Sequence, residues 1–298
     1  MIFAFMIYPG KLAWQTCLLA ESIRTFAGNI ANEPIWVLVP QSVESLLAET
    51  RANLEAQQVR LIPFALDEAV VNFPFAAKVV AAAAAESVAM AESNDQLVWM
   101  DTDSLVVQEP ADLRLTTMKQ VGYRPVDHTL IGLLWDAPLD AFWELVYERC
   151  GVLAKRPFPM TGSVDRKRIR PYFNAGMLVT RPGSQLLQNW CNQFLQNHQD
   201  PAFTPFYEQH VLYRIFMHQA ILTGTILAQF EQSELQLLPH LVNYPLHMHA
   251  TYPRSRRPAL LNDVITTRYD ELLQAPNWRE LIDIAEPLQS WLVARVPG

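Results

Sequence analysis

The chain has 298 residues, of which 50% are hydrophobic, 18% charged and 10% aromatic. This composition is typical of a folded protein with a large core, and it excludes a disordered protein, a collagen-like fibre and a coiled coil. Lys and Arg number 23 against 30 Asp and Glu, which gives a formal net charge of −7. A nucleic-acid partner is therefore not expected, because neutralising a phosphate backbone needs an excess of basic residues.

The opening residues are apolar, but they lack a basic leader and are interrupted by Pro9-Gly10-Lys11. We expect a buried strand here and no signal peptide. No apolar run approaches the roughly 20 residues of a membrane-spanning helix, so no membrane span is expected. The three cysteines, Cys17, Cys150 and Cys191, lie far apart and form no CxxC pair. This spacing predicts reduced thiols and a cytoplasmic protein.

The first third of the chain alternates short apolar runs with segments of helical periodicity. The pattern predicts strands at residues 2–8, 34–40, 59–63 and 96–100. Helices are expected at residues 14–26, after Ser42 as an N-cap, and at the alanine-rich residues 75–90. Strands that alternate with helices imply crossover connections, and hence an α/β fold with a largely parallel sheet.

The second half is less regular. Strands are expected at residues 121–126 and 174–180, and helices at residues 139–152, 185–196 and 208–222. The basic, proline-punctuated residues 155–171 predict a surface loop. No Gly/Ser-rich linker marks a boundary, so one continuous domain is the simpler interpretation.

The segment Leu97-Val98-Trp99-Met100-Asp101-Thr102-Asp103 leads from a buried strand into two carboxylates. Side chains at i and i+2 of an extended chain point the same way, so both carboxylates can reach one ligand. Ligands of open α/β sheets bind outside the carboxyl ends of the strands, where this pair would lie. Two carboxylates plus substrate phosphates are the usual ligands of Mg²⁺ or Mn²⁺. The alternative is a solvated turn, since roughly one D-x-D triplet is expected by chance in such a chain.

Four further segments extend this pattern, in order along the chain: Lys78, Tyr172-Phe173-Asn174-Ala175-Gly176-Met177-Leu178-Val179, Phe206-Tyr207-Glu208-Gln209-His210-Val211-Leu212 and Leu238-Pro239-His240-Leu241-Val242-Asn243-Tyr244. With the D-x-D strand, they resemble the Lys, F-N-[AS]-G, D-Q-[DA]-x-L and L-P-x-x-[YF]-N segments of GT-A fold nucleotide-sugar glycosyltransferases, most of all the glycogenin- and galactosyltransferase-like (family 8) group. The resemblance covers most of residues 1–260. It implies a single GT-A-type domain with a mixed, mostly parallel sheet flanked by helices, and a C-terminal helical extension over residues 261–298 packed on the same domain.

The chain departs from this family at three places. Glu208 stands where the family has Asp, which lengthens the side chain by one methylene. The first strand is followed by Tyr8-Pro9-Gly10-Lys11 instead of the family's common Asp and Tyr. The C-terminal H-x-x-G-x-x-K-P-W segment is missing, and the nearest candidate is His247-Met248-His249 followed by Arg254, Arg256 and Arg257.

The resemblance also implies roles for individual residues. Asp101 would lie near the ribose and bind the metal ion, and Asp103 would bind the metal ion on the diphosphate. His249 is favoured over His247 as a third metal ligand, and imidazole suits Mn²⁺ better than Mg²⁺. The remaining site residues that it implies are Glu208, Gln209 and Asn174 at the catalytic centre, and Tyr8, Lys78 and Gly176 with the donor.

Two basic segments leave alternatives open. Arg254, Arg256 and Arg257 match phosphate oxygens in geometry and could bind the diphosphate, but a solvated basic turn is the more common use of such residues. The segment Arg166-Lys167-Arg168-Ile169-Arg170 would be a lid over the donor, a face for an anionic acceptor or a solvated loop.

The resulting hypothesis is a metal-dependent glycosyltransferase. It would transfer a sugar from a nucleoside diphosphate-sugar donor, a UDP-sugar by preference, to a saccharide or other acceptor hydroxyl, with Mn²⁺ or Mg²⁺. The resemblance implies retention at the anomeric carbon, and the same segments would also fit an inverting enzyme. The alternative is a catalytically silent GT-A-like protein that binds nucleotide or sugar. A nucleotidyltransferase is disfavoured because the chain has no long Gly-rich basic loop after its first strand. The absence of GxxxxGK, GxGxxG, GxSxG and HExxH argues against several other enzyme classes.

Overall fold

The structure is a computed structural model that describes residues 1–8, 13–41, 48–275 and 277–296. The predicted turn at Pro9-Gly10-Lys11 and the predicted N-cap Ser42 lie outside the described residues. At the centre is a seven-stranded sheet with the order β10-β6-β9-β4-β1-β2-β3. Its strands are β1 (Ile2–Met6), β2 (Ile35–Pro40), β3 (Val59–Phe64), β4 (Leu97–Met100), β6 (Val121–Pro125), β9 (Phe173–Thr180) and β10 (Leu235–Leu237).

The sheet is mixed but mostly parallel, as expected. Strands β1, β2, β3 and β4 run parallel to one another, and β10 runs parallel to β6. Strand β9 lies between β4 and β6 and is antiparallel to both. The start of β9 therefore lies at the same sheet edge as the end of β4, and this brings residues 174–176 next to residue 101.

A second, three-stranded sheet lies beside this edge. It has the order β11-β12-β5, with β5 at Ser104–Val106, β11 at Tyr244–Pro245 and β12 at Thr266–Arg268. Strand β12 is antiparallel to β5, which begins directly after Asp103. This pairing places the segment around residue 268 against the D-x-D segment. A two-stranded hairpin, β7 (Met160–Thr161) with β8 (Arg168–Ile169), lies within the predicted loop 155–171.

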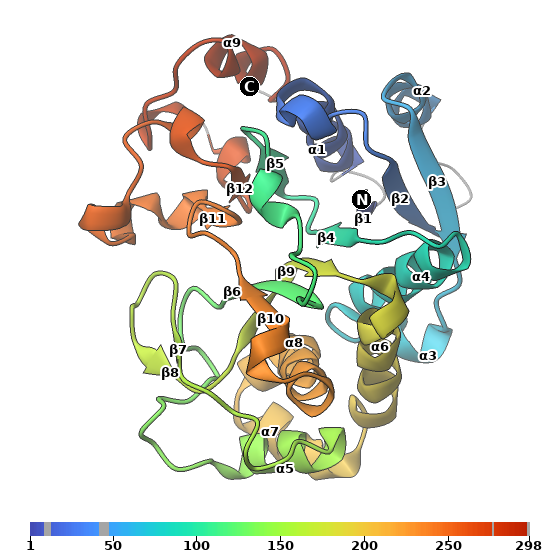
Figure 1. Ribbon diagram of the computed structural model, residues 1–298, viewed down its shortest axis with the longest axis vertical. Coiled ribbons are helices and arrows are strands. Elements are labelled where there is room, and N and C mark those ends of the chain that lie inside the picture. Colours follow the sequence, from blue (N-terminus) through green and yellow to red (C-terminus); the bar gives the residue numbers. More distant parts are fainter. Residues whose placement is uncertain (9–12, 42–47, 276, 297–298) are drawn as a thin grey trace.

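Helices cover both faces of the central sheet, as Figure 1 shows. The helices are α1 (Ala13–Phe26), α2 (Ala48–Ala56), α3 (Glu68–Val71), α4 (Ala76–Ala91), α5 (Ala141–Cys150), α6 (Leu186–Asn197), α7 (Thr204–Gln209), α8 (Val211–Gln229) and α9 (Leu288–Val293). The helix expected over residues 208–222 is thus two helices, because His210 is extended and its ring nitrogen accepts from the Leu212 amide as the N-cap of α8.

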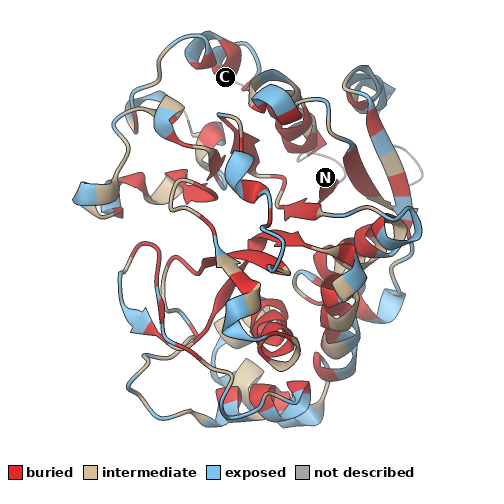
Figure 2. Cartoon of the chain, in the orientation of Figure 1, coloured by how far each residue is buried: buried red, intermediate tan, exposed pale blue. Residues whose placement is uncertain are grey.

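Strand alternation divides the core into two layers. In β1, Ile2, Ala4 and Met6 pack toward α4, α6 and α8, whereas Phe3 and Phe5 pack toward α1. All five β1 residues are buried, which fits a central strand covered on both faces (Figure 2). The chain after residue 260 contributes β12, several 3₁₀ turns and α9, and it packs on α1 and β5.

Helix α8 is the exception to the expectation that no segment could span a membrane. An 18-residue window of this 19-residue helix has a mean hydropathy of 1.3, and among the described residues the helix alone passes a test of length and apolar composition. However, 61% of this window is buried inside the protein, against α5, α6 and β9. Its apolar residues therefore serve as core contacts here.

A buried carboxylate joins two helices of this layer. Glu86 of α4 is fully buried, and its Oε2 accepts a hydrogen bond of 2.8 Å from the Gln188 amide in the first turn of α6. Helix α6 lacks a side-chain cap of its own, so Glu86 satisfies an otherwise free amide. Burial outweighs these hydrogen bonds and raises the pKa of Glu86 to about 7.

We predict that Glu86 makes the stability of the protein fall as pH rises. The folded state holds the Glu86 proton more tightly than the unfolded state does. The contribution of Glu86 to the free energy of unfolding is therefore fully present below about pH 4.5 and is lost as the pH rises through about pH 7. Glu86→Gln keeps the hydrogen-bond acceptor and removes the titration. Urea denaturation should therefore show the variant gaining on the order of 2 kcal/mol relative to wild type between about pH 5 and about pH 8.

Glu92→Gln is the matched control, since Glu92 follows the same helix but is exposed and pairs with Arg60. Its stability relative to wild type should change little over the same pH range. A Glu86→Gln profile parallel to that of wild type would contradict the prediction.

Candidate active site

The carboxylate pair lies at the edge of the central sheet where β4 ends and β9 begins. The Asp101 amide donates to the Gly176 carbonyl oxygen at 2.8 Å, which continues the β4–β9 ladder by one residue. Asp101 is held further by Lys78 of α4, whose ammonium lies 2.7 and 2.8 Å from its two carboxylate oxygens. The Lys78 residue is 3% exposed. The predicted site residues Lys78, Asp101 and Gly176 therefore lie together.

Gly176 is a position where a side chain would not fit. A Cβ atom there would lie 2.9 Å from an Asp101 carboxylate oxygen and 2.9 Å from the Asn174 side-chain oxygen. The same Asn174 oxygen accepts from the Gly176 amide at 2.7 Å. The glycine thus allows Asp101 and Asn174 to approach each other closely across the strand end.

Two cavities adjoin at the carboxylate pair. The larger has a volume of 350 Å³, and the smaller one has 210 Å³. Both are lined by Phe75, Asp101, Asp103 and Asp270. The smaller cavity adds Tyr8, Gln15, Thr102, Glu271 and Gln274, and the larger adds residues of several elements that include Lys78, Asn174, Gly176, His218, Gln219, His247 and Arg268.

Asp103 lies in the cleft formed by these two cavities and has no partner for its charge among the described side chains. Within the described part of the chain, no side chain donates a hydrogen bond to its carboxylate. Burial and the neighbouring Asp101 charge raise the pKa of Asp103 to about 7, against the opposite effect of Arg268 and Lys78. The Arg268 guanidinium pairs with Asp127 at 2.6 Å. The pKa of Tyr8 is raised by burial and by the same two aspartates.

A glutamine and a histidine of α8 face the larger cavity. The Gln219 side-chain oxygen accepts from the Ala175 amide at 3.1 Å, so Gln219 is tied to the start of β9. The Nδ1 atom of His218 lies 2.9 Å from the Ile215 carbonyl oxygen, which can only accept, so Nδ1 bears the proton and Nε2 is an acceptor. Burial and the Lys78 charge hold the pKa of His218 well below its ordinary value.

The structure places the predicted glutamine segment away from both cavities. Glu208 and Gln209 are exposed at the end of α7 and line neither cavity, because His210 breaks the helix before α8 turns into the core. The residues that reach the cavity are His218 and Gln219. A signal for this was present in the sequence, since Gln209 and Gln219 are each followed by Leu three residues later, and only Gln219 is followed directly by Ala.

Of the two candidate histidines, His247 lies nearer the cleft than the preferred His249. The structure places His247 on the larger cavity, and His249 lines neither cavity. His249 is buried, and its Nδ1 atom lies 2.9 Å from the Tyr244 hydroxyl. The residues of this segment form a 3₁₀ helix (Leu246–Thr251), in which positions 247 and 249 do not share a face.

The two basic segments contribute nothing to the lining of either cavity. Arg257 donates to the carbonyl oxygens of Ala250 and Tyr252, and Arg254 is exposed. Sequence reasoning instead missed Arg268 and Asp270, which reach the cleft through the pairing of β12 with β5. No local pattern around these two residues distinguishes them from other polar pairs.

The donor set fits a divalent cation only together with a substrate. Among the described residues, no three His, Cys, Asp or Glu side chains converge closely enough to hold a metal ion. The carboxylate of Asp103 lacks a described hydrogen-bond donor, and the buried Nδ1 atom of His247 also has no partner there. A cation bound by Asp103 and phosphate oxygens would relieve the repulsion between the two carboxylates, as is usual for Mg²⁺ and Mn²⁺ sites.

Comparisons with solved structures agree with this fold. An active-site glutamine-to-glutamate mutant of LgtC superposes with a TM-score of 0.52 and 15% identity, over 100% of this chain and 97% of that one. The apo structure of the bifunctional glycosyltransferase WbbM gives a TM-score of 0.52 and 13% identity, over 99% of this chain and 51% of that one. LgtC with donor and acceptor sugar analogues gives 0.49 and 16% identity, over 100% and 97%. These identities establish similarity of fold alone.

A search of curated protein sequences finds no significant match. The sequence model of the Rhodobacterales glycosyltransferase domain, in contrast, matches residues 3–220, which include the D-x-D segment, all of β9 and His218 with Gln219. The predicted glycosyltransferase resemblance and the α/β fold class are therefore confirmed, and the chain belongs to the Rhodobacterales glycosyltransferase domain family.

Proposed function

We propose that this glycosyltransferase uses a nucleoside diphosphate-sugar donor, a UDP-sugar by preference, together with Mn²⁺ or Mg²⁺, and that it retains the anomeric configuration. The observation that carries the donor proposal is the pair of adjoining cavities with Asp101 and Asp103 at their junction. A nucleoside in the smaller cavity and a sugar in the larger one would place the diphosphate at the carboxylates. Retention rests on the resemblance to family 8.

Different residues would bind the nucleoside, the sugar and the diphosphate of the donor. Tyr8 and Gln15 line the smaller cavity and would contact the nucleoside. Asn174 and Gln219 present amide groups to the larger cavity, where they would hydrogen-bond sugar hydroxyls and fix the sugar's orientation. Arg268 adds a guanidinium at the junction, which suits the developing charge on a leaving diphosphate.

Asp103, with His247 as a second ligand, would hold the cation. When bound, a divalent ion supplies Lewis-acid stabilisation of the leaving diphosphate. Lys78 holds Asp101 in place, with its ammonium 2.7 Å from the carboxylate. An exposed edge of the larger cavity then admits the acceptor hydroxyl.

The experiment that tests the donor site is a thermal-shift screen of nucleoside diphosphates and UDP-sugars, each with and without Mn²⁺. We expect a metal-dependent rise in Tm for one base. Asp103→Asn should abolish this rise and lower metal-dependent turnover by about 100-fold or more. Metal-dependent turnover near the wild-type rate in the variant would overturn the proposal. Donor binding by wild type without transfer or hydrolysis would favour the catalytically silent alternative.

We expect Gln219 to be needed for transfer and Gln209 to be dispensable. Gln219→Asn withdraws the amide from the cavity by one methylene and should lower kcat by about 100-fold. Gln209→Asn is the matched control, because Gln209 is exposed on α7, and its turnover should stay within about twofold of wild type. Initial rates with the donor found in the screen, and the anomeric configuration of the product by NMR, are the measurements. Equal losses in both variants would contradict this assignment.

We expect Gly176→Ala to separate folding from function. Its new methyl group would meet only the ends of two side chains, so Tm should change by no more than about 3 °C. Displacement of Asp101 and Asn174 should nonetheless abolish the metal-dependent thermal shift with nucleotide. Gly183→Ala is the control, since a Cβ there meets no atom within 4 Å. A full nucleotide shift in Gly176→Ala would show that the close approach is not required.

A further inference from the structure

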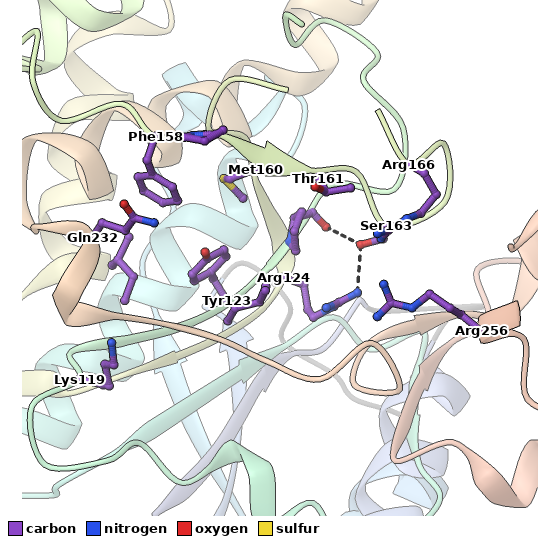
Figure 3. A pocket seen from close by; sticks show the side chains of 14 residues that line it. Lys119, Tyr123, Arg124, Phe158, Met160, Thr161, Ser163, Arg166, Gln232 and Arg256 are labelled. Atoms are coloured by element: carbon purple, nitrogen blue, oxygen red, sulfur yellow. Dashed lines mark hydrogen bonds between the residues drawn. The ribbon is translucent and has the colours of Figure 1, made fainter. Parts of the chain in front are cut away.

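The two basic segments that do not reach the cleft meet instead in a separate cavity of 500 Å³ (Figure 3). Arg166 comes from the segment between β7 and β8, and Arg256 comes from a 3₁₀ turn after β11. Between them lies Arg124 of β6, whose residue is 7% exposed. Lys119 lies at the opposite end of the cavity. Four cationic side chains thus line one cavity although they are far apart in the sequence.

Among the described residues, no acidic side chain lines this cavity and none of these four residues forms an ion pair. The chain as a whole has a net charge of −7, so carboxylates are not scarce elsewhere. Two other arginines of the segment 166–170 are already engaged. Arg168 pairs with Asp136 at 3.5 Å, and Arg170 donates to the Ala137 carbonyl oxygen at 2.7 Å.

Arg124 is fixed in place by the fold. Its guanidinium donates to the Leu238 carbonyl oxygen at 2.8 Å and to the Ser163 hydroxyl at 3.1 Å. Burial lowers the pKa of Arg124 against the opposite effects of Tyr252 and Asp127, and the charges of Arg256 and Arg166 add smaller effects in the same direction as burial. These arginines carry like charges that repel one another, and an anionic ligand in the cavity would relieve that repulsion.

The position of Arg166 is also enforced. Its backbone has a φ of 56°, a region that residues with a side chain rarely adopt. The preceding Asp165 accepts from the amide and hydroxyl of Thr129, at 2.9 and 2.7 Å, and from the Lys167 amide at 3.1 Å. The Asp165 carboxylate therefore stabilises the turn and does not pair with the Arg166 guanidinium, which lines the cavity.

The rest of the lining suits a sugar. The rings of Tyr123 and Phe158 form one wall, and Thr161, Ser163 and Gln232 add polar groups. The volume lies within the roughly 300–1,000 Å³ of small-molecule sites and is far larger than a phosphate ion requires. Aromatic rings beside polar groups are the usual surroundings of an amphipathic ligand such as a saccharide.

We propose that this cavity binds a phosphorylated saccharide, with the phosphate on Arg124, Arg166 and Arg256 and the sugar against Tyr123 and Phe158. Its place in the fold indicates a use. Strand β6 lines this cavity with Tyr123, Arg124 and Pro125, and the next two residues line the larger cavity of the cleft. Resting on the proposed transferase function, we assign the bound saccharide phosphate as the acceptor.

The test measures binding of glucose 6-phosphate by titration calorimetry in excess EDTA, with glucose and inorganic phosphate as partial ligands. The double variant Arg166→Gln, Arg256→Gln should weaken glucose 6-phosphate binding by about tenfold or more. The control double variant Lys167→Gln, Arg254→Gln removes the same charge from the same two segments, at exposed residues outside the cavity, and should bind like wild type.

Asp103→Asn should also bind like wild type, because no donor or metal is present in the assay. The result is therefore independent of whether the donor proposal holds. Equal weakening in both double variants would overturn the proposal, since it would indicate a general charge effect. Loss of binding in Asp103→Asn, no saturable binding by wild type, or equal affinity for inorganic phosphate and glucose 6-phosphate would overturn it as well.

Discussion

The ion pair between Lys78 and Asp101 is the contact around which the cleft is built. A buried carboxylate beside a second carboxylate is unfavourable unless a cation lies next to it, and Lys78 is that cation for Asp101. The ammonium can reach only if α4 lies close to the sheet. The small buried residues Ala81, Ala82 and Ala85 of α4 permit this approach. The alanine run therefore has a packing role as well as a high helix propensity.

Asp103 is in the opposite situation, because no described side chain neutralises it. The two carboxylates should therefore have different roles. Asp101 stabilises the fold through Lys78 as well as lining the cleft, whereas Asp103 is available to bind a metal ion. Removing Lys78 would leave the partly exposed Asp101 beside a second carboxylate without its counterion, which is unfavourable. The Lys78–Asp101 ion pair thus contributes both to the stability of the fold and to the geometry of the carboxylate pair in the cleft.

Much of this arrangement was predictable from the sequence, and the reasons for the failures are specific. Strand β4 with its terminal aspartates, and the segment from Asn174 to Gly176, stand out because apolar runs end there in polar residues or glycine. Gln219 was missed, although the sequence held a signal for it, because the helix break at His210 changes which glutamine enters the core, and His210 makes that break by capping α8 with its own side chain. Arg268 was missed because its place depends on pairing across more than 150 residues of sequence.

Strand β6 and the two residues after it connect the basic cavity with the larger cavity of the cleft, and this connection limits how an acceptor could be bound. Arg124 lies on a strand of the seven-stranded sheet, whereas Arg166 and Arg256 lie on connecting segments. A phosphate bound to all three would have one partner on the sheet and two on the segments that border it. Because β6 continues directly from Pro125 into Val126 at the cleft, the distance from anchor to transfer site is fixed by the backbone. An acceptor of the wrong length would then be rejected by geometry, even where its phosphate binds.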